Sequence, residues 1–359
     1  MDNKKLILLG IITVCMIAWA IVQSHISNRP RTEAEKSAYL IQGLDPSNID
    51  SIVLGTGENE VTLKRNGRRF VVTNKDNYPA ETADINNLIA SCLDIKVDEL
   101  VTDNPSNYKD LGVTEEDAIS IVKFLKPDSG LLVGVIVGKG KDQGRGAFVR
   151  IIPGNKVYVT LEHPWIKNQA MNYVNRELVT VDRKSIESVT VSSSDETYTL
   201  KANDGGEDII LENHPPDKKL KNGDCEAVFT ALNNLRFEDV MKETATSSKE
   251  LTFNNKFVCR LKDSTVYTMK IAQKDDKTFI TCLAEFTDKN PVTKEEGIVE
   301  SEDVLKEKEA KLLARDKAEE FSSRHGNWVY EISENDTGNL VKQLSELFED
   351  ENKEATEEE

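Results

Sequence analysis

Histidines are the side chains best suited to acid–base or metal chemistry in this 359-residue chain, and it contains only four. His163 and His214 each precede a proline, which is typical of loops, while His25 and His325 stand apart from them. None has a cysteine or a second histidine three or four residues away, the spacing that zinc sites use. The sequence therefore predicts neither a metal site nor a cofactor.

A glycine-rich stretch from Gly134 to Gly140 invites comparison with phosphate-binding loops, and it fails that comparison. The spacing between Gly134 and Gly138 is one residue short of the motif, and Gly140 stands where a serine or threonine would hold magnesium. A strand, not a helix, is expected to follow. We therefore interpret the stretch as a β-turn in which glycine supplies a positive φ.

Other catalytic signatures are equally weak. No G-x-S-x-G nucleophile turn occurs, and Asp275-Asp276-Lys277 predicts a hairpin turn rather than a pair of catalytic carboxylates. The sequence therefore favours a protein that is not an enzyme. A Ser-His-Asp triad needs no adjacency in sequence, so a hydrolase without a sequence signature is kept as the least favoured hypothesis.

The charge balance restricts the kinds of partner. Acidic side chains outnumber basic ones by 63 to 46, which gives a net charge of −17. Nucleic acids are bound through clustered lysines and arginines that neutralise phosphates, so this composition argues against a nucleic-acid partner. An acidic body is also expected to stay clear of anionic lipid headgroups.

An internal repeat organises the chain. LDPSNIDSIVL at 44–54 matches VDRKSIESVTV at 181–191, and alternating apolar residues predict strands in both copies. Later apolar stripes at 170–178 and 340–348 predict a closing helix in each copy. Before them, apolar residues spaced i, i+3, i+4 and i+7 predict a central helix in each copy, with Ile85, Leu88, Ile89 and Cys92 in the first and Cys225, Val228, Phe229 and Leu232 in the second.

These elements predict an α+β fold. One N-terminal transmembrane helix precedes two similar repeat units, at 44–180 and 181–348, each an antiparallel β-sheet with packed helices. The second unit carries a charged helical insertion at 285–326, and the acidic tail at 349–359 is expected to be disordered. Four cysteines permit disulfides without requiring them: Cys92, Cys225, Cys259 and Cys282.

Residues 1–23 are expected to anchor the protein in a membrane, and 24–43 to form a linker. Leu6–Val22 contains seventeen uncharged residues, close to the shortest helix that spans a bilayer. A long domain that follows a first hydrophobic segment is usually exported. We therefore expect a single-pass protein of a bacterial inner membrane, with its N-terminus in the cytoplasm and its body in the periplasm. A cleaved signal peptide and a cytoplasmic body are the alternatives.

The charged segment Ser301–Arg324 predicts a helix whose apolar stripe has two interpretations. The stripe packs on its own domain, as amphipathic helices usually do, or it docks a partner. Trp328, at the start of a predicted strand, likewise belongs to the core or to a seam between domains. The candidate partner-docking residues are Ala310, Leu313, Ala314, Ala318, Phe321 and Trp328.

Several short motifs give the chain a family resemblance. They are the L-D-P-x-x-I-x-S-I form at 44–52, the segment Tyr108–Gly112 before a strand, Gly138-Lys139 after one, and the closing strand Asn327–Ile332. Together they resemble the DUF4340 family of bacterial exported proteins, over about residues 40–348. The resemblance implies an accessory role beside an ABC-type exporter and a gliding-motility-type auxiliary subunit, and it implies no catalytic residues.

The leading hypothesis is a non-enzymatic, membrane-anchored periplasmic accessory protein of an ABC-type transporter or an envelope assembly. Its expected partners are the membrane, through Leu6–Val22, and membrane proteins such as an ABC permease, its ATPase or an auxiliary subunit. The second hypothesis is a stand-alone envelope module that binds a peptide, a glycan or a lipid.

Overall fold

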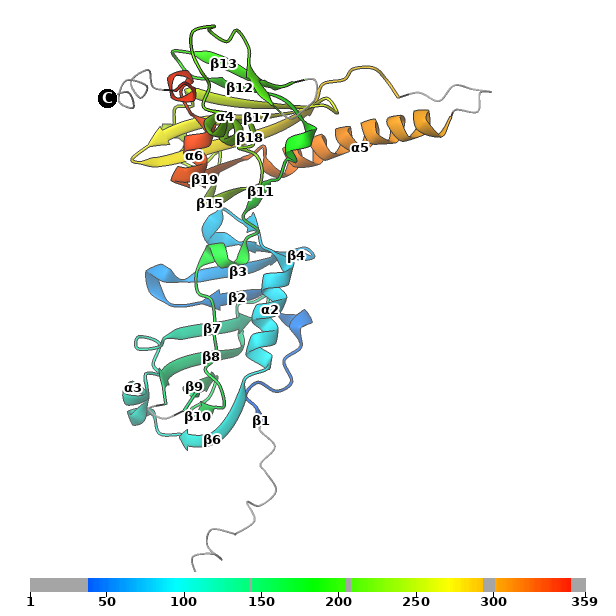
Figure 1. Ribbon diagram of the computed structural model, residues 1–359. Helices are drawn as coiled ribbons and strands as arrows, with labels where there is room; N and C mark the ends of the chain where they lie inside the picture. Colours follow the sequence, from blue (N-terminus) through cyan, green and yellow to red (C-terminus); the bar gives the residue numbers. More distant parts are fainter. Residues whose placement is uncertain (1–37, 142–143, 204–207, 293–300, 350–359) are drawn as a thin grey trace, which may run out of the picture. The chain divides into compact units, whose positions relative to one another are not determined.

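The computed structural model in Figure 1 describes four stretches of the chain: residues 38–141, 144–203, 208–292 and 301–349. These stretches form two compact units. Unit 1 comprises the described residues within 1–65 and 85–168, and unit 2 comprises those within 66–84 and 169–359. Unit 2 therefore takes in a short segment of the chain that lies between two parts of unit 1.

Unit 1 is built on one sheet with the strand order β1-β6-β10-β9-β8-β7-β2-β3, in which every neighbouring pair is antiparallel. Helix α2 buries the four apolar residues of its predicted stripe. The strands are β1 (Ala38–Tyr39), β2 (Ser51–Leu54), β3 (Val61–Asn66), β6 (Lys96–Thr102), β7 (Ser120–Leu125), β8 (Leu131–Gly140), β9 (Ala147–Ile152) and β10 (Val157–Thr160). The helices are α2 (Thr82–Leu93), whose first three residues fall in unit 2, and α3 (Tyr108–Leu111). 3-10 turns lie at Pro46–Asn48, Gly57–Asn59 and Pro105–Asn107.

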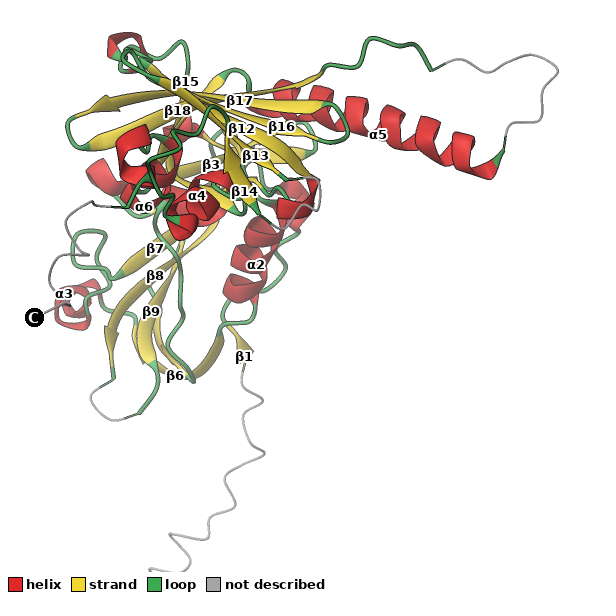
Figure 2. Cartoon of the chain, turned by 45° about the horizontal axis from the view of Figure 1, so that its top comes forward, coloured by secondary structure: helices red, strands yellow, loops and turns green. Residues whose placement is uncertain are grey.

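Unit 2 contains a second antiparallel sheet, with the order β11-β15-β19-β18-β17-β16-β12-β13-β14, and Figure 2 shows its strands in yellow beside the long helix α5. The strands are β11 (Glu177–Val179), β12 (Ile186–Ser192), β13 (Thr197–Ala202), β14 (Ile209–Leu211), β15 (Leu235–Lys242), β16 (Asn255–Leu261), β17 (Thr265–Lys274), β18 (Lys277–Phe286) and β19 (Trp328–Ile332). The hairpin β4 (Arg69–Val72) and β5 (Tyr78–Pro79) also belongs to unit 2, with the 3-10 turn Thr73–Lys75 between its strands. The helices are α4 (Asn222–Phe229), α5 (Glu302–His325) and α6 (Glu334–Leu340), with 3-10 turns at Ala170–Tyr173, Arg183–Ser185, Ser248–Glu250 and Leu344–Leu347.

The internal repeat is visible in the topology of the two sheets. The order β6-β10-β9-β8-β7-β2-β3 in unit 1 corresponds strand by strand to β15-β19-β18-β17-β16-β12-β13 in unit 2. Each copy begins with a 3-10 turn that an aspartate caps: Asp45 accepts a hydrogen bond from the backbone N–H of Ser47, and Asp182 accepts one from that of Lys184, both at 2.9 Å. Two repeat-like β units therefore fit the duplicated sequence.

The predicted α+β class with an N-terminal transmembrane helix is wrong. Two large antiparallel sheets make up most of the described chain and helices are few, so the architecture is mainly β. Within the stretches that the structure describes, no helix is both long and apolar enough to cross a membrane. The longest of them, α5, carries charged side chains in every turn. The predicted anchor Leu6–Val22 lies outside the described residues.

The closing helix predicted at 170–178 is also wrong. There the chain forms a 3-10 turn at Ala170–Tyr173 and then strand β11, which pairs with β15. In the second copy α6 ends at Leu340, where the predicted stripe begins, and a 3-10 turn follows at Leu344–Leu347. Short apolar stripes with helical spacing also occur where a turn is followed by a buried strand. The spacing alone therefore could not distinguish a helix from this arrangement.

The four cysteines of the described chain are buried free thiols: Cys92, Cys225, Cys259 and Cys282. Burial raises the pKa of Cys92 and of Cys259 to about 12, and it also raises the pKa of Cys282. A thiol with a raised pKa stays protonated at neutral pH and reacts slowly. The cysteines therefore act as small apolar core residues.

The glycine-rich stretch is a strand, so the predicted β-turn is wrong. Gly138 lies inside β8 and does not have a positive φ. A Cβ atom at Gly138 would lie 2.7 Å from Cγ1 of Val113 and would overlap the carbonyl oxygen of Leu111. Glycine is required at this position because the backbone that follows α3 passes directly against the strand.

Replacing Gly138 with alanine is expected to lower the free energy of unfolding by about 1–3 kcal/mol, because the added methyl group forces the α3 segment away from β8. Denaturant unfolding of the purified protein measures this change. The matched control is Gly223→Ala in α4, where an added Cβ meets no atom within 4 Å and where alanine favours the helix. Equal stability of the Gly138→Ala and Gly223→Ala proteins would contradict this account of β8.

Candidate functional site

Helix α5 is the main element of the candidate site, and the sequence predicted a helix at Ser301–Arg324. Ser301 caps it by accepting a hydrogen bond from the backbone N–H of Val304, at 3.4 Å. Acidic residues occupy its first turn and the cationic Arg324 lies in its last turn, the arrangement that a helix dipole favours. Figure 1 shows one end of α5 beside the strands of unit 2 and the other end projecting away from them.

The C-terminal half of α5 is fixed to the sheet of unit 2. Ser322 exchanges two hydrogen bonds with the backbone of Ala284 in β18: its hydroxyl donates to the carbonyl at 2.6 Å and accepts from the N–H at 2.8 Å. The ring of Phe321 packs edge-on against Tyr267, with 5.1 Å between centroids. Ala314 and Ala318 are buried on the same face. This half of the helix is therefore a structural part of the unit.

The predicted docking residues separate into two groups. Ala314 and Ala318 are buried, and Phe321 and Trp328 are partly buried within unit 2. Ala310 and Leu313 are exposed in the projecting half of the helix, where Leu313 shows 51% of its surface. The structure thus places only Ala310 and Leu313 where a partner could reach them without displacing the sheet.

The projecting half carries apolar residues that the sequence prediction missed. Val304, Leu305 and Leu312 are exposed there together with Leu313, and Leu305 shows 53% of its surface. Leu305 and Leu312 are seven residues apart, so they lie on one face of the helix, away from the face of Ala314 and Ala318. The seven-residue spacing of the two leucines could have predicted this exposed face, but the sequence prediction considered only the face that contains the alanines.

An aromatic cluster lies at the C-terminal end of α5. Tyr78 comes from strand β5, Phe237 from β15, and Trp328 and Tyr330 from β19. The ring centroids of Tyr78 and Trp328 are 4.8 Å apart, and those of Phe237 and Tyr330 are 4.7 Å apart. His325 joins the cluster through a 2.7 Å hydrogen bond between its Nδ1 and the hydroxyl of Tyr330. Trp328, one of the predicted docking residues, is thus part of the packing of unit 2.

Polar contacts hold the β4–β5 hairpin on the same strands. The Nζ atom of Lys75 lies 2.6 Å from a carboxylate oxygen of Asp239, and Asp76 accepts a hydrogen bond from the backbone N–H of Lys242 at 2.9 Å. The hydroxyls of Tyr78 and Tyr330 are 3.5 Å apart. The hairpin therefore contributes both an aromatic ring and an ion pair to unit 2.

Burial sets the protonation states in the cluster. Burial and, to a smaller extent, the nearby Arg324 guanidinium lower the pKa of His325 to about 4. Burial also raises the pKa values of Tyr78 and Tyr330. All three side chains are consequently uncharged at neutral pH, which suits a packed hydrogen-bonded core rather than a site of proton transfer.

The other described histidines lie apart from this cluster. His163 is exposed, with its Nδ1 atom 3.1 Å from the carbonyl of Pro164, and His214 is exposed and packs against Phe348. Across the described stretches, no three His, Cys, Asp or Glu side chains come close enough together to hold a metal ion.

A family model matches the chain. The model described as "Domain of unknown function (DUF4340)" covers residues 71–256, just over half of the chain, and spans parts of both units. Neither the curated proteins nor the solved structures give a match. The matched range includes Tyr78 and Phe237 of the aromatic cluster, and it ends before α5. The chain therefore belongs to the DUF4340 family.

Proposed function

We propose that this protein is a non-enzymatic accessory protein of an ABC-type transporter or an envelope assembly, and that it works by binding a protein partner through the projecting half of α5. The observation that carries the proposal is the exposure of Val304, Leu305, Leu312 and Leu313 on a helix whose other half is fixed to the sheet. A rigidly held helix presents such residues without the ordering cost of a flexible segment.

The energetics favour a helix-in-groove mode of recognition. Full burial of a fully exposed leucine is worth about 1.5–3 kcal/mol. Leu305, Leu312 and Leu313 are 37–53% exposed, so a partner groove that covers them gains roughly half of that from each. Lysines and glutamates alternate along the same half of the helix, which suits a polar rim around that apolar contact. The association with a transporter follows the family resemblance, and location at the envelope follows the apolar sequence Leu6–Val22 ahead of an acidic body.

Co-purification tests the proposal. A C-terminal tag on the full-length protein, gentle solubilisation of membranes and mass spectrometry are expected to recover an ABC permease with its ATPase. The double variant Leu305→Ser/Leu312→Ser is expected to reduce that recovery at least about tenfold, because it removes two apolar anchors. Both residues are exposed, so the variant should unfold at the same denaturant concentration as the parent protein.

Ala310→Ser is the matched control, since Ala310 is exposed on the same half of the helix but points toward the side of the buried alanines. It should leave recovery unchanged. Recovery of the protein alone, with no effect of the leucine changes, would contradict the proposal and favour the stand-alone binding module. Loss of recovery with Ala310→Ser but not with the leucine changes would place the contact on the opposite face.

A further inference from the structure

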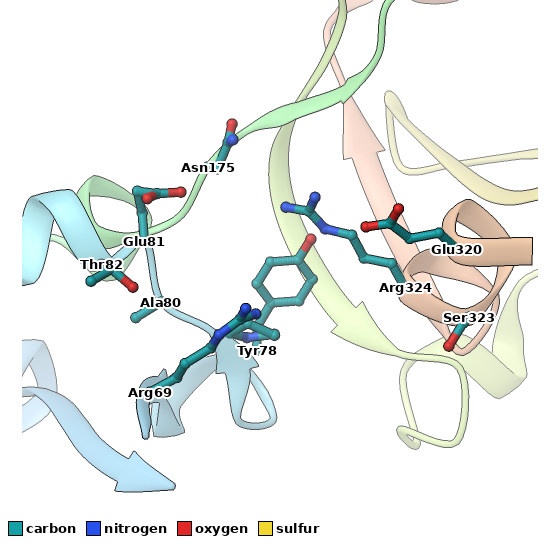
Figure 3. A pocket seen from close by; sticks show the side chains of 10 residues that line it. Arg69, Tyr78, Ala80, Glu81, Thr82, Asn175, Glu320, Ser323 and Arg324 are labelled. Atoms are coloured by element: carbon teal, nitrogen blue, oxygen red, sulfur yellow. The ribbon is translucent and has the colours of Figure 1, made fainter. Parts of the chain in front are cut away.

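A polar cavity of about 480 Å³ lies within unit 2, next to the aromatic cluster and separate from the projecting half of α5. Its volume falls in the range of small-molecule sites. Figure 3 shows the side chains of the hairpin segment on one side of the cavity and the last turns of α5 on the other. The residues that line it are Arg69, Tyr78, Pro79, Ala80, Glu81, Thr82, Asn175, Glu320, Ser323 and Arg324.

Two arginines line the cavity. Neither Arg69 nor Arg324 forms an ion pair with any residue that the structure describes. Figure 3 shows the Arg324 guanidinium near the hydroxyl of Tyr78, and its charge lowers the pKa of Tyr78 against the larger effect of burial. A guanidinium presents a planar fork of N–H donors that matches a carboxylate, so the pair forms a place for that group.

Two glutamates line the same cavity. Glu81 precedes α2, and Glu320 lies one turn before Arg324 on α5. Because the two acids balance the two arginines, a ligand with charges of one sign is attracted at one place and repelled at another. A ligand that carries both a carboxylate and an ammonium group is attracted by both kinds of side chain.

We propose that this cavity binds a zwitterionic amino acid or short peptide. Its carboxylate contacts Arg69 and Arg324, and its ammonium group contacts Glu81 on the hairpin side of the cavity (Figure 3). Ser323, Thr82 and Asn175 supply additional hydrogen-bonding groups at the wall, while Tyr78, Pro79 and Ala80 supply the apolar part. The site does not include the exposed leucines of α5, so ligand binding in the cavity can be tested independently of partner docking.

Calorimetric titration of the full-length protein with L-alanyl-L-alanine and L-alanyl-L-alanyl-L-alanine tests the proposal. We expect at least one of these peptides to bind with a Kd no weaker than about 1 mM. N-acetyl-L-alanine keeps only the carboxylate and L-alaninamide keeps only the ammonium group, and each should bind at least about tenfold more weakly. Arg69→Gln and Arg324→Gln should each weaken peptide binding at least about tenfold, since a bidentate charged contact is lost.

Arg315→Gln is the matched control. Arg315 lies on the same helix, is exposed, is not among the lining residues and lies within 4 Å of acids on α5 itself. Its change should leave peptide binding unaltered, and all three variants should unfold like the parent protein. Four results would overturn the proposal: neither peptide binds at about 10 mM, N-acetyl-L-alanine binds as well as the peptides, the Arg324→Gln protein binds like the parent, or O-phosphoethanolamine binds better than both peptides. The last result would assign the cavity to a lipid headgroup.

Discussion

Replacing Phe237 with alanine is expected to lower the free energy of unfolding of unit 2 by about 3–5 kcal/mol. Phe237 is 1% exposed and contacts the rings of both Tyr78 and Tyr330. Its removal costs the transfer free energy of the ring and leaves a cavity between β15, β19 and the β4–β5 hairpin. These elements are fixed by ladder hydrogen bonds and by the Lys75–Asp239 ion pair, so they cannot collapse fully into the space.

Denaturant unfolding followed by the fluorescence of Trp328 measures this change, because Trp328 packs against Tyr78 inside the cluster. The control is Ile210→Ala on the edge strand β14, where half of the side chain is already exposed and the change should stay within about 0.5 kcal/mol. Phe237→Leu should lose less stability than Phe237→Ala, because it leaves a smaller void. Equal losses for Phe237→Ala and Ile210→Ala would show that the cluster is not packed as described.

The repeat was the most informative feature of the sequence because its signal is local. Matching strands at 44–54 and 181–191 implied matching hairpins, and the two sheets indeed follow the same strand order. The Asp275-Asp276 turn was also predictable, since a two-residue hairpin loop needs positive φ and both residues have it. Helix α5 was found for the same reason, from the charge pattern and the apolar stripe within one segment.

Features that depend on distant contacts were not predictable. Tyr78 and Tyr330 are 252 residues apart, and nothing in the sequence around Tyr78 shows that its ring packs against Tyr330 and Phe237. Gly138 looked like a turn residue because its real constraint, the close approach of the α3 segment, is a tertiary contact. The arginines of the cavity carry no motif, since Arg69 and Arg324 come together only through the fold.

As the pH is lowered from 7 to 4, His325 alone is expected to reduce the free energy of unfolding by about 3 kcal/mol. The pKa of this side chain is about 4 in the folded protein and 6.5 when it is free of its surroundings. Between these values the unfolded chain binds a proton that the folded protein does not, so stability is fully present above about pH 6.5 and declines as the pH falls toward 4. The groups around the ring are Tyr330, Phe321 and Arg324. None of them carries a negative charge that would stabilise the protonated imidazole.

The pH range in which His325 lowers the stability lies above the range in which the acidic side chains do so. Ion pairs with Lys274 and Lys311 lower the pKa values of Glu250 and Asp288 below 4.5 and 3.8, so these carboxylates stabilise the fold at higher pH and lose that contribution only below those values. Denaturant unfolding at pH 6.5 and pH 5 therefore isolates His325, with an expected difference of about 2 kcal/mol. His325→Gln cannot take up the proton and should remove most of that difference, whereas His214→Gln, in an exposed loop, should keep it. An unchanged pH dependence in the His325→Gln protein would mean that His325 reaches solvent and is protonated in the folded state.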